Sequence, residues 1–203
     1  MLAESGDMTP VEGTVDLDIP IDVLWESFSH PNLWARWNRC FFWGKNRDLK
    51  VGEHLIWAFE PIRAWYLYKL WSIANIVEVE KGKKATWEVT AFPGMYARHT
   101  YHMEDLGNGR TRFGSWEQAM GPGFRVLRKF WVAHFTFVKD ESLIGAARLN
   151  GVYKRTGALD EAELPRKVIA MMQTTAMRAT RRAYSTREAP RSSLAMRLVS
   201  HAD

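Results

Sequence analysis

The chain has 203 residues, of which 46% are hydrophobic and 25% are charged, a composition typical of one globular domain with a sizeable core. Its net charge of +5 arises between residues 165 and 203, where Lys and Arg outnumber Asp and Glu by more than that amount. The rest of the chain is close to neutral, which argues against a nucleic-acid-binding domain. Because Cys40 is the one cysteine, an intrachain disulfide and a cysteine-based metal cluster are excluded.

The N-terminal residues predict no targeting signal. They contain neither a basic start nor an apolar core, and no run of about 18 apolar residues occurs in the chain. We expect residues 1–10 to be flexible, and the protein to be cytoplasmic without a membrane span.

The first elements of the folded region are predicted to be a strand and two short helices. Apolar residues alternate over 11–19, and Pro20 ends this strand. A short helix follows. A second segment, which begins at Pro31, places Trp34 and Trp37 three residues apart on one helical face.

Alternating patterns then predict an antiparallel meander. Its strands cover residues 40–49, 54–59, 70–80, 85–91, 95–105 and 110–120, and turn signals such as Asn108-Gly109 separate them. On the third of these strands we expect Trp71 and Ile73 to face the interior. On the last strand we expect Glu117 to face solvent, because a lone buried carboxylate is costly. The alternative places Glu117 in the interior, paired with a histidine as a general base.

The periodicity changes after Gly123. Apolar residues recur at helical spacing from Phe124 to Tyr153, which predicts a helix of about 30 residues and about 45 Å. We expect it to bend or to change its packing partner near Gly145.

The segments 18–25 and 29–38, with their Pro and Trp residues, and the order of the elements resemble the START-like or SRPBCC superfamily. This superfamily includes polyketide cyclase/dehydrase and lipid-transport families. The resemblance covers residues 11–155 and implies an α+β helix-grip fold. In that fold, a curved antiparallel sheet wraps around a long C-terminal helix, with two short helices after the first strand. Residues 156–203 lie outside the resemblance and are predicted to form a basic, partly helical extension.

The resemblance also implies an internal cavity, and the apolar strand faces predict its lining. The predicted lining combines aromatic side chains with histidines: Trp57, Phe59, Trp71, Trp87, His99, Tyr101, Trp131, His134 and Phe135. Beside them we expect Ile73, Val89, Leu127 and Val138. His99, Tyr101 and His134 are candidates for acid/base catalysis. The same three groups equally fit core hydrogen bonds or the orientation of a ligand.

Three functions fit this reading. The first is binding or carriage of a hydrophobic small molecule, such as a lipid, isoprenoid, sterol or polyketide. The second is a polyketide cyclase/dehydratase-type enzyme that uses the same cavity. The third is a membrane-surface or adaptor protein, whose basic tail makes peripheral contact with anionic lipid.

The sequence predicts no metal site and no cofactor. His99 and His102 are three residues apart on one strand, so they point to opposite faces. The glycine-containing segments are too short for a phosphate loop and are interpreted as turns. The pattern does not specify an oligomeric state.

Overall fold

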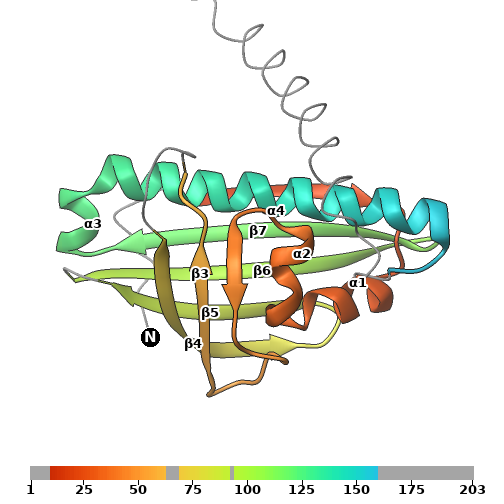
Figure 1. Cartoon of the computed structure of the whole chain (residues 1–203), viewed down its shortest axis with the longest axis horizontal. Helices are drawn as coiled ribbons and strands as arrows, with labels where there is room; N and C mark the ends of the chain where they lie inside the picture. Colours follow the sequence, from red (N-terminus) through yellow and green to blue (C-terminus); the bar gives the residue numbers. More distant parts are fainter. Residues whose placement is uncertain (1–9, 63–68, 92–93, 160–203) are drawn as a thin grey trace, which may run out of the picture. The chain divides into compact units, whose positions relative to one another are not determined.

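The computed structural model describes residues 10–62, 69–91 and 94–159, which lie in one compact unit that spans Met1–Leu164. Within these residues, seven strands form one antiparallel sheet in the order β1-β7-β6-β5-β4-β3-β2 (Figure 1). The strands are β1 (Val11–Leu17), β2 (Phe41–Gly44), β3 (His54–Phe59), β4 (Leu70–Glu80), β5 (Lys84–Ala91), β6 (Met95–Gly107) and β7 (Arg110–Met120).

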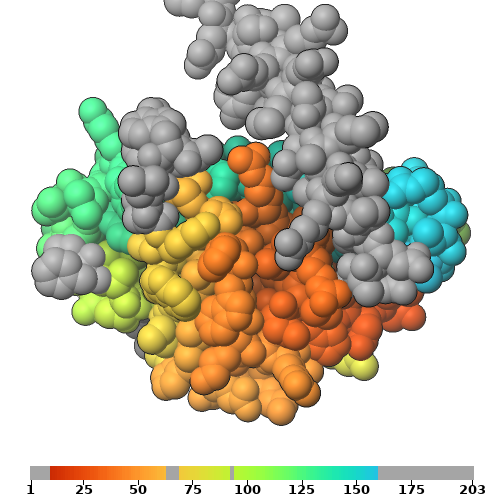
Figure 2. Space-filling view, viewed as in Figure 1, coloured from red at the N-terminus to blue at the C-terminus, as the bar shows by residue number. Residues whose placement is uncertain are grey.

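Four α-helices accompany the sheet in the described residues: α1 (Ile21–Phe28), α2 (Trp34–Trp37), α3 (Pro122–Val126) and α4 (Arg128–Thr156). A 3-10 turn (Pro31–Leu33) precedes α2. The α4 helix runs the length of the sheet and contacts β1, β7 and α2 (Figure 1). In the space-filling view, the segment from α2 to β3 (orange) forms the centre of the visible face (Figure 2). This architecture is the predicted α+β helix-grip fold, and the fold class is confirmed.

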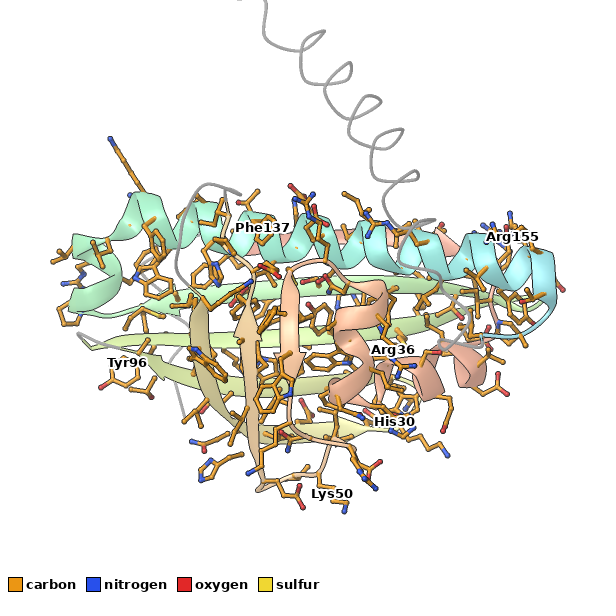
Figure 3. The ribbon with its side chains drawn as sticks, in the orientation of Figure 1. His30, Arg36, Lys50, Tyr96, Phe137 and Arg155 are labelled. Atoms are coloured by element: carbon orange, nitrogen blue, oxygen red, sulfur yellow. The ribbon has the colours of Figure 1, made fainter. Side chains whose placement is uncertain are left out.

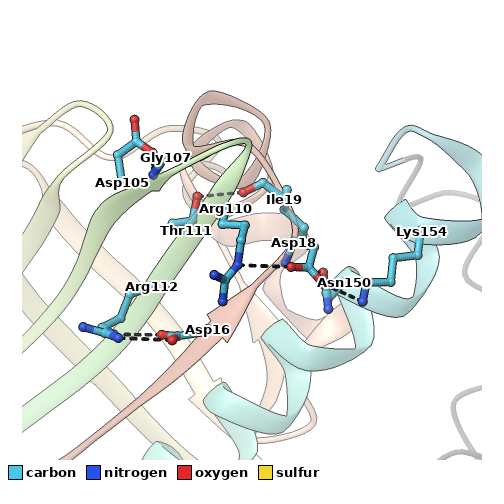
Figure 4. Close-up of polar contacts among 10 residues, drawn as sticks. All are labelled: Asp16, Asp18, Ile19, Asp105, Gly107, Arg110, Thr111, Arg112, Asn150 and Lys154. Atoms are coloured by element: carbon cyan, nitrogen blue, oxygen red, sulfur yellow. Dashed lines mark hydrogen bonds and ion pairs between the residues drawn. The ribbon is translucent and has the colours of Figure 1, made fainter.

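Ion pairs fasten the edge strand β1 to its neighbours (Figure 4). The Arg112 guanidinium donates to Asp16 at 2.8 and 3.1 Å. The backbone N–H of Asp18 donates to Asn150 Oδ1 of α4 at 2.8 Å, and the Asp18 carboxylate pairs with Lys154. Such exposed pairs each contribute little stability, but together they hold β1 in register between β7 and α4.

Aromatic side chains fill the interior beneath α1 and α2. Trp34, which is 1% exposed, stacks on Phe28 and Trp87 at centroid distances of 5.6 and 5.5 Å. Its Nε1 donates a hydrogen bond of 2.7 Å to the Phe28 carbonyl oxygen. Tyr101 and Phe113 stack at 5.4 Å beside them. This part of the interior is therefore a packed aromatic core.

The β4 strand faces the opposite way from the prediction. Ala74 and Ile76 are buried, whereas Trp71 and Ile73 are 63% and 59% exposed. The pattern was ambiguous because apolar residues occupy both faces of this strand. On the outer face, Trp71 packs against Trp43 of β2 at a centroid distance of 5.7 Å.

The segment predicted as a strand over 40–49 forms a shorter strand, because β2 ends at Gly44. A Cβ atom at position 44 would lie 2.5 Å from the Pro31 carbonyl oxygen. The backbone before α2 therefore passes directly against the end of β2. After Gly44, the side chain of Asn46 makes hydrogen bonds to the backbone of β3. It donates to the His54 carbonyl and accepts from the Ile56 N–H.

The long helix is interrupted at Leu127 and not at Gly145. Leu127 has φ −109° and ψ 26°, which separates α3 from α4, and α4 continues unbroken to Thr156. Gly145 instead permits close packing, since a Cβ there would lie 2.7 Å from the Trp37 carbonyl oxygen of α2. Gly145, where we expected a bend or a change of packing partner, is the point at which α4 packs against the end of α2.

Candidate functional site

The described residues contain a pocket between the sheet and the N-terminal half of α4. It has a volume of about 50 Å³ and is lined by Phe41, Trp57, Phe59, Leu70, Trp71, Ser72, Trp87, Val89, Ala91, Met95, Ala97, His99, Glu117, Trp131, His134 and Phe135. Side chains of the sheet and of α4 meet in this space (Figure 3). The pocket belongs to the end of the sheet marked by Tyr96 in Figure 3, opposite the end of α4 marked by Arg155.

The structure brings the predicted lining residues together, with the exception of Tyr101. Trp71 contributes to the lining although 63% of it is exposed. Two of the flanking predictions are wrong: Ile73 is 59% and Leu127 is 44% exposed. Val138 is buried in the main core and not at the pocket. That these side chains bind a ligand stays a prediction.

Tyr101 is engaged in a polar network of the packed core. Its hydroxyl hydrogen-bonds with Ser142 Oγ at 2.6 Å. Ser142 also accepts a bond of 2.9 Å from Asn38 Nδ2 and donates one of 2.7 Å to the Val138 carbonyl. Burial raises the pKa of Tyr101 well above its ordinary value. This geometry gives Tyr101 a role in joining β6, α2 and α4.

Glu117 is buried in the pocket wall, so the prediction that it faces solvent is wrong. The register of β5, β6 and β7 aligns Trp87, His99 and Glu117 in one row across the sheet. Glu117 is 7% exposed, and its Oε2 lies 3.5 Å from Nδ1 of His99. The other ring nitrogen of His99 hydrogen-bonds with Ser115 Oγ at 3.1 Å. The nearby histidine is the group that the alternative prediction required.

Burial decides the protonation of these groups. It raises the pKa of Glu117 well above its ordinary value and lowers the pKa of His134 to about 4. Burial, with a smaller effect of His134, lowers the pKa of His99 to about 3. At neutral pH the two histidines are therefore uncharged, and burial favours the protonated form of Glu117. The distance of 3.5 Å between His99 and Glu117 is too long for a good hydrogen bond.

Three polar atoms of the pocket residues have no hydrogen-bond partner in the part of the chain that the structure describes. They are Nε1 of Trp57, Nε1 of Trp131 and Oε2 of Glu117. Buried polar atoms are nearly always paired in folded proteins. These three are therefore positions at which a bound molecule or water would find a partner.

The described residues contain no group of three or more His, Cys, Asp or Glu side chains that could hold a metal ion. Within the same residues, no helix is long and apolar enough to span a membrane. The basic extension predicted to contact lipid lies, from residue 160 onward, outside the described residues.

Sequence reasoning gave an interior Glu117 beside a histidine only as the alternative, and it did not identify His99 as that histidine. The available signal was Phe113, which lies on the same face of β7 and is 1% exposed. Strand alternation from Phe113 leads through Ser115 to Glu117. The expected cost of a buried charge outweighed that signal, but burial raises the pKa of Glu117 and so favours its uncharged form.

Comparisons with known proteins identify the fold. No protein-family model and no curated protein matches the chain. Among solved structures, the chain is similar to an aromatase/cyclase (Zhui) from a Streptomyces species, with 13% identity, a TM-score of 0.58, and coverage of 73% of this chain and 97% of that chain. A protein from Chromobacterium violaceum has 14% identity and a TM-score of 0.53, covering 70% of this chain and 96% of its own.

A protein from Mycobacterium smegmatis has 12% identity and a TM-score of 0.53, covering 76% of this chain and 96% of its own. At these identities the comparisons establish the fold alone. The chain shares the helix-grip fold with these proteins, which is the fold that the resemblance of its sequence implies.

Proposed function

We propose that the protein binds a small hydrophobic molecule in the pocket between the sheet and α4. The observation that supports this most is the lining, where aromatic and apolar side chains surround a few polar groups. Ligand sites typically have this composition. Burial of apolar surface would supply most of the binding free energy, at about 25 cal/mol per Å².

The size of the pocket limits the ligand. Its volume of about 50 Å³ is well below the roughly 150 Å³ of an apolar cavity that holds benzene. A ligand of one or two rings would therefore enter with rotation of lining side chains or with part of it outside the pocket. A sterol would require a much larger rearrangement.

Native mass spectrometry of the protein isolated from its own host, followed by organic extraction, tests this proposal directly. We expect a discrete small apolar compound to be released on extraction. A protein that carries no compound, and that binds none of a panel of one- and two-ring aromatic molecules in calorimetry, would contradict the proposal.

Filling the pocket should weaken binding. Ala97 lines the pocket and is 3% exposed, so Ala97→Leu places three extra carbon atoms in the space that a ligand needs. We expect the affinity for toluene, measured by calorimetry, to fall by about tenfold or more, because overpacking costs about 1–3 kcal/mol. Ala133→Leu on the exposed face of α4 is the matched control and should leave the affinity unchanged. Equal affinities of the two variants would contradict the proposed location.

The second candidate function is a cyclase- or dehydratase-type enzyme acting in the same pocket. The supporting observation is that His134 and Glu117 both line it. Burial lowers the pKa of His134 to about 4 and raises the pKa of Glu117. The name of the Streptomyces neighbour, an aromatase/cyclase, motivates the same candidate. With a ketone bound, a ring nitrogen of His134 would take the α-proton while Glu117 gives its proton to the carbonyl oxygen. The product is the enol, and the reverse reaction regenerates both residues.

This candidate predicts exchange of hydrogen for deuterium in the methyl group of acetophenone in D₂O. Wild-type protein should accelerate the exchange, followed by NMR, above the rate in buffer. His134→Gln should abolish the acceleration while the affinity for acetophenone stays within about tenfold. A wild-type protein that binds acetophenone without accelerating exchange would speak for carriage and against this chemistry.

A further inference from the structure

The pocket wall contains three buried polar atoms without partners. Glu117 Oε2 and Nε1 of Trp57 and Trp131 form no hydrogen bond within the described residues. All three residues line the pocket and are 2–7% exposed. A buried polar atom without a partner destabilises the folded protein. A ligand that supplies partners would therefore gain affinity at these atoms.

The chemistry of the three groups defines what the partner must be. An indole N–H is a donor and cannot accept a hydrogen bond. Burial raises the pKa of Glu117, and the protonated form of a carboxylic acid also has an O–H to donate. The missing partner is therefore a hydrogen-bond acceptor. A hydrocarbon would leave all three groups unpaired.

The described lining also favours an uncharged ligand. No Lys or Arg side chain is among the described residues that line the pocket, and His99 and His134 are neutral. A carboxylate or phosphate would lose its water without gaining a counter-charge, which is strongly unfavourable. The described lining therefore disfavours fatty acids and phosphate esters that would bury their headgroup here.

The surroundings of Glu117 hold its carboxyl group at a defined position. His99 lies beside it at 3.5 Å and is held in turn by Ser115 at 3.1 Å. Trp87, which pairs with His99 across β5 and β6, lies against the His99 ring at a centroid distance of 5.2 Å. Aromatic rings pack favourably against other flat rings, so this lining favours a planar ligand.

We propose that the pocket recognises a neutral, planar ketone or aldehyde, whose carbonyl oxygen accepts a hydrogen bond from the carboxylic acid of Glu117. This proposal rests on the proposed function, because it names the class of ligand for the same pocket. The indole N–H groups of Trp57 and Trp131 provide donors for further acceptor atoms of such a molecule.

A matched pair of probes tests whether the pocket recognises a carbonyl oxygen. Acetophenone and α-methylstyrene have the same planar skeleton, but the first has a carbonyl oxygen where the second has a CH₂ group. Calorimetry gives the affinity of both for the wild-type protein, Glu117→Leu and Glu117→Gln. The ratio of the two affinities within each protein cancels differences in hydrophobicity between the probes.

We expect the preference for acetophenone to be about tenfold larger in the wild type than in Glu117→Leu, the effect of one hydrogen bond to a buried donor. Glu117→Gln should retain most of it, because the amide N–H₂ group also donates. Equal ratios in the wild type and Glu117→Leu would overturn the carbonyl proposal and leave hydrophobic binding intact. If neither probe binds, both the carbonyl proposal and the proposed function are wrong for ligands of this size.

Infrared spectroscopy supplies a second readout, which is valid even if Glu117→Leu does not fold. The wild-type protein should show the carbonyl-stretch band of a protonated carboxylic acid, which Glu117→Gln lacks. Acetophenone should shift that band, and α-methylstyrene should not. Absence of the band at neutral pH would overturn the proposal, because an ionised Glu117 cannot donate to a carbonyl oxygen.

Discussion

Replacement of Trp34 by alanine should lower the free energy of unfolding by about 3–5 kcal/mol, the usual cost of removing a fully buried aromatic ring. Trp34 is 1% exposed and contacts the rings of Phe28, Phe41 and Trp87 at centroid distances of 4.9–5.6 Å. No side chain beside it is free to fill the space, because the surrounding core is itself packed. The loss is a large fraction of the roughly 5–15 kcal/mol that stabilises a typical domain. Urea denaturation followed by circular dichroism measures it.

Two matched variants show which part of Trp34 matters. Trp34→Phe keeps most of the ring but loses the hydrogen bond from Nε1 to the Phe28 carbonyl, so we expect a loss of about 1–2 kcal/mol. Trp71→Ala removes the same side chain from a position that is 63% exposed, so its cost should be about 0.5 kcal/mol. Comparable losses for Trp34→Ala and Trp71→Ala would contradict the assignment of Trp34 to the core.

The double variant with His99→Gln and His134→Gln should gain stability relative to the wild type as the pH falls from 7.5 to 5. In the wild type, burial lowers the pKa values of His99 and His134 to about 3 and about 4, from 6.5. A group with a lowered pKa binds its proton in the unfolded chain first, so acid favours unfolding between pH 6.5 and the folded pKa. Each histidine therefore lowers the free energy of unfolding of the wild type by about 2 kcal/mol between pH 7.5 and pH 5. The stability of the double variant relative to the wild type should rise by about 4 kcal/mol over this interval.

Glu117 acts in the opposite direction, which is why the comparison uses variants. Its pKa is raised above the ordinary 4.5, so its stabilising effect is complete below pH 4.5 and declines as the pH rises through the folded pKa. Between pH 4.5 and the folded pKa, the free energy of unfolding of the wild type falls by about 1.4 kcal/mol per pH unit relative to that of Glu117→Gln. Denaturation at pH 5, 6.5 and 7.5 measures both effects. Parallel pH profiles for the wild type and the double variant would show that the histidines are not buried as neutral groups.

The prediction of the fold succeeded where local signals were unambiguous. The two short helices follow a proline-terminated strand, and tight-turn residues separate most of the later strands. Each of these signals acts within a few residues, so it survives without tertiary information. The predicted orientation of β4 was wrong because both faces of this strand carry apolar residues, Trp71 on one and Ala74 on the other. Alternation alone does not indicate which of two apolar faces the sheet buries.

The candidate site was predictable only in part. Strand alternation placed His99 on the same face as its apolar neighbours, and helical spacing placed Trp131 and His134 on the same face of the helix. Tyr101 shares the face of His99, yet Ser142 holds it in the packed core. The pocket occupies one end of the interior only, and a periodicity within one strand does not specify where along the strand the space remains.

The sequence by itself determined the class of fold, the order of its elements and the aromatic character of the interior, because these depend on local periodicity and composition. The tertiary structure alone decided which strand faces point inward, where the aromatic side chains leave a pocket, and that Glu117 lies beside His99. The last contact depends on the register between β6 and β7. Register depends on packing across the whole sheet, and burial at that position then raises the pKa of the acid.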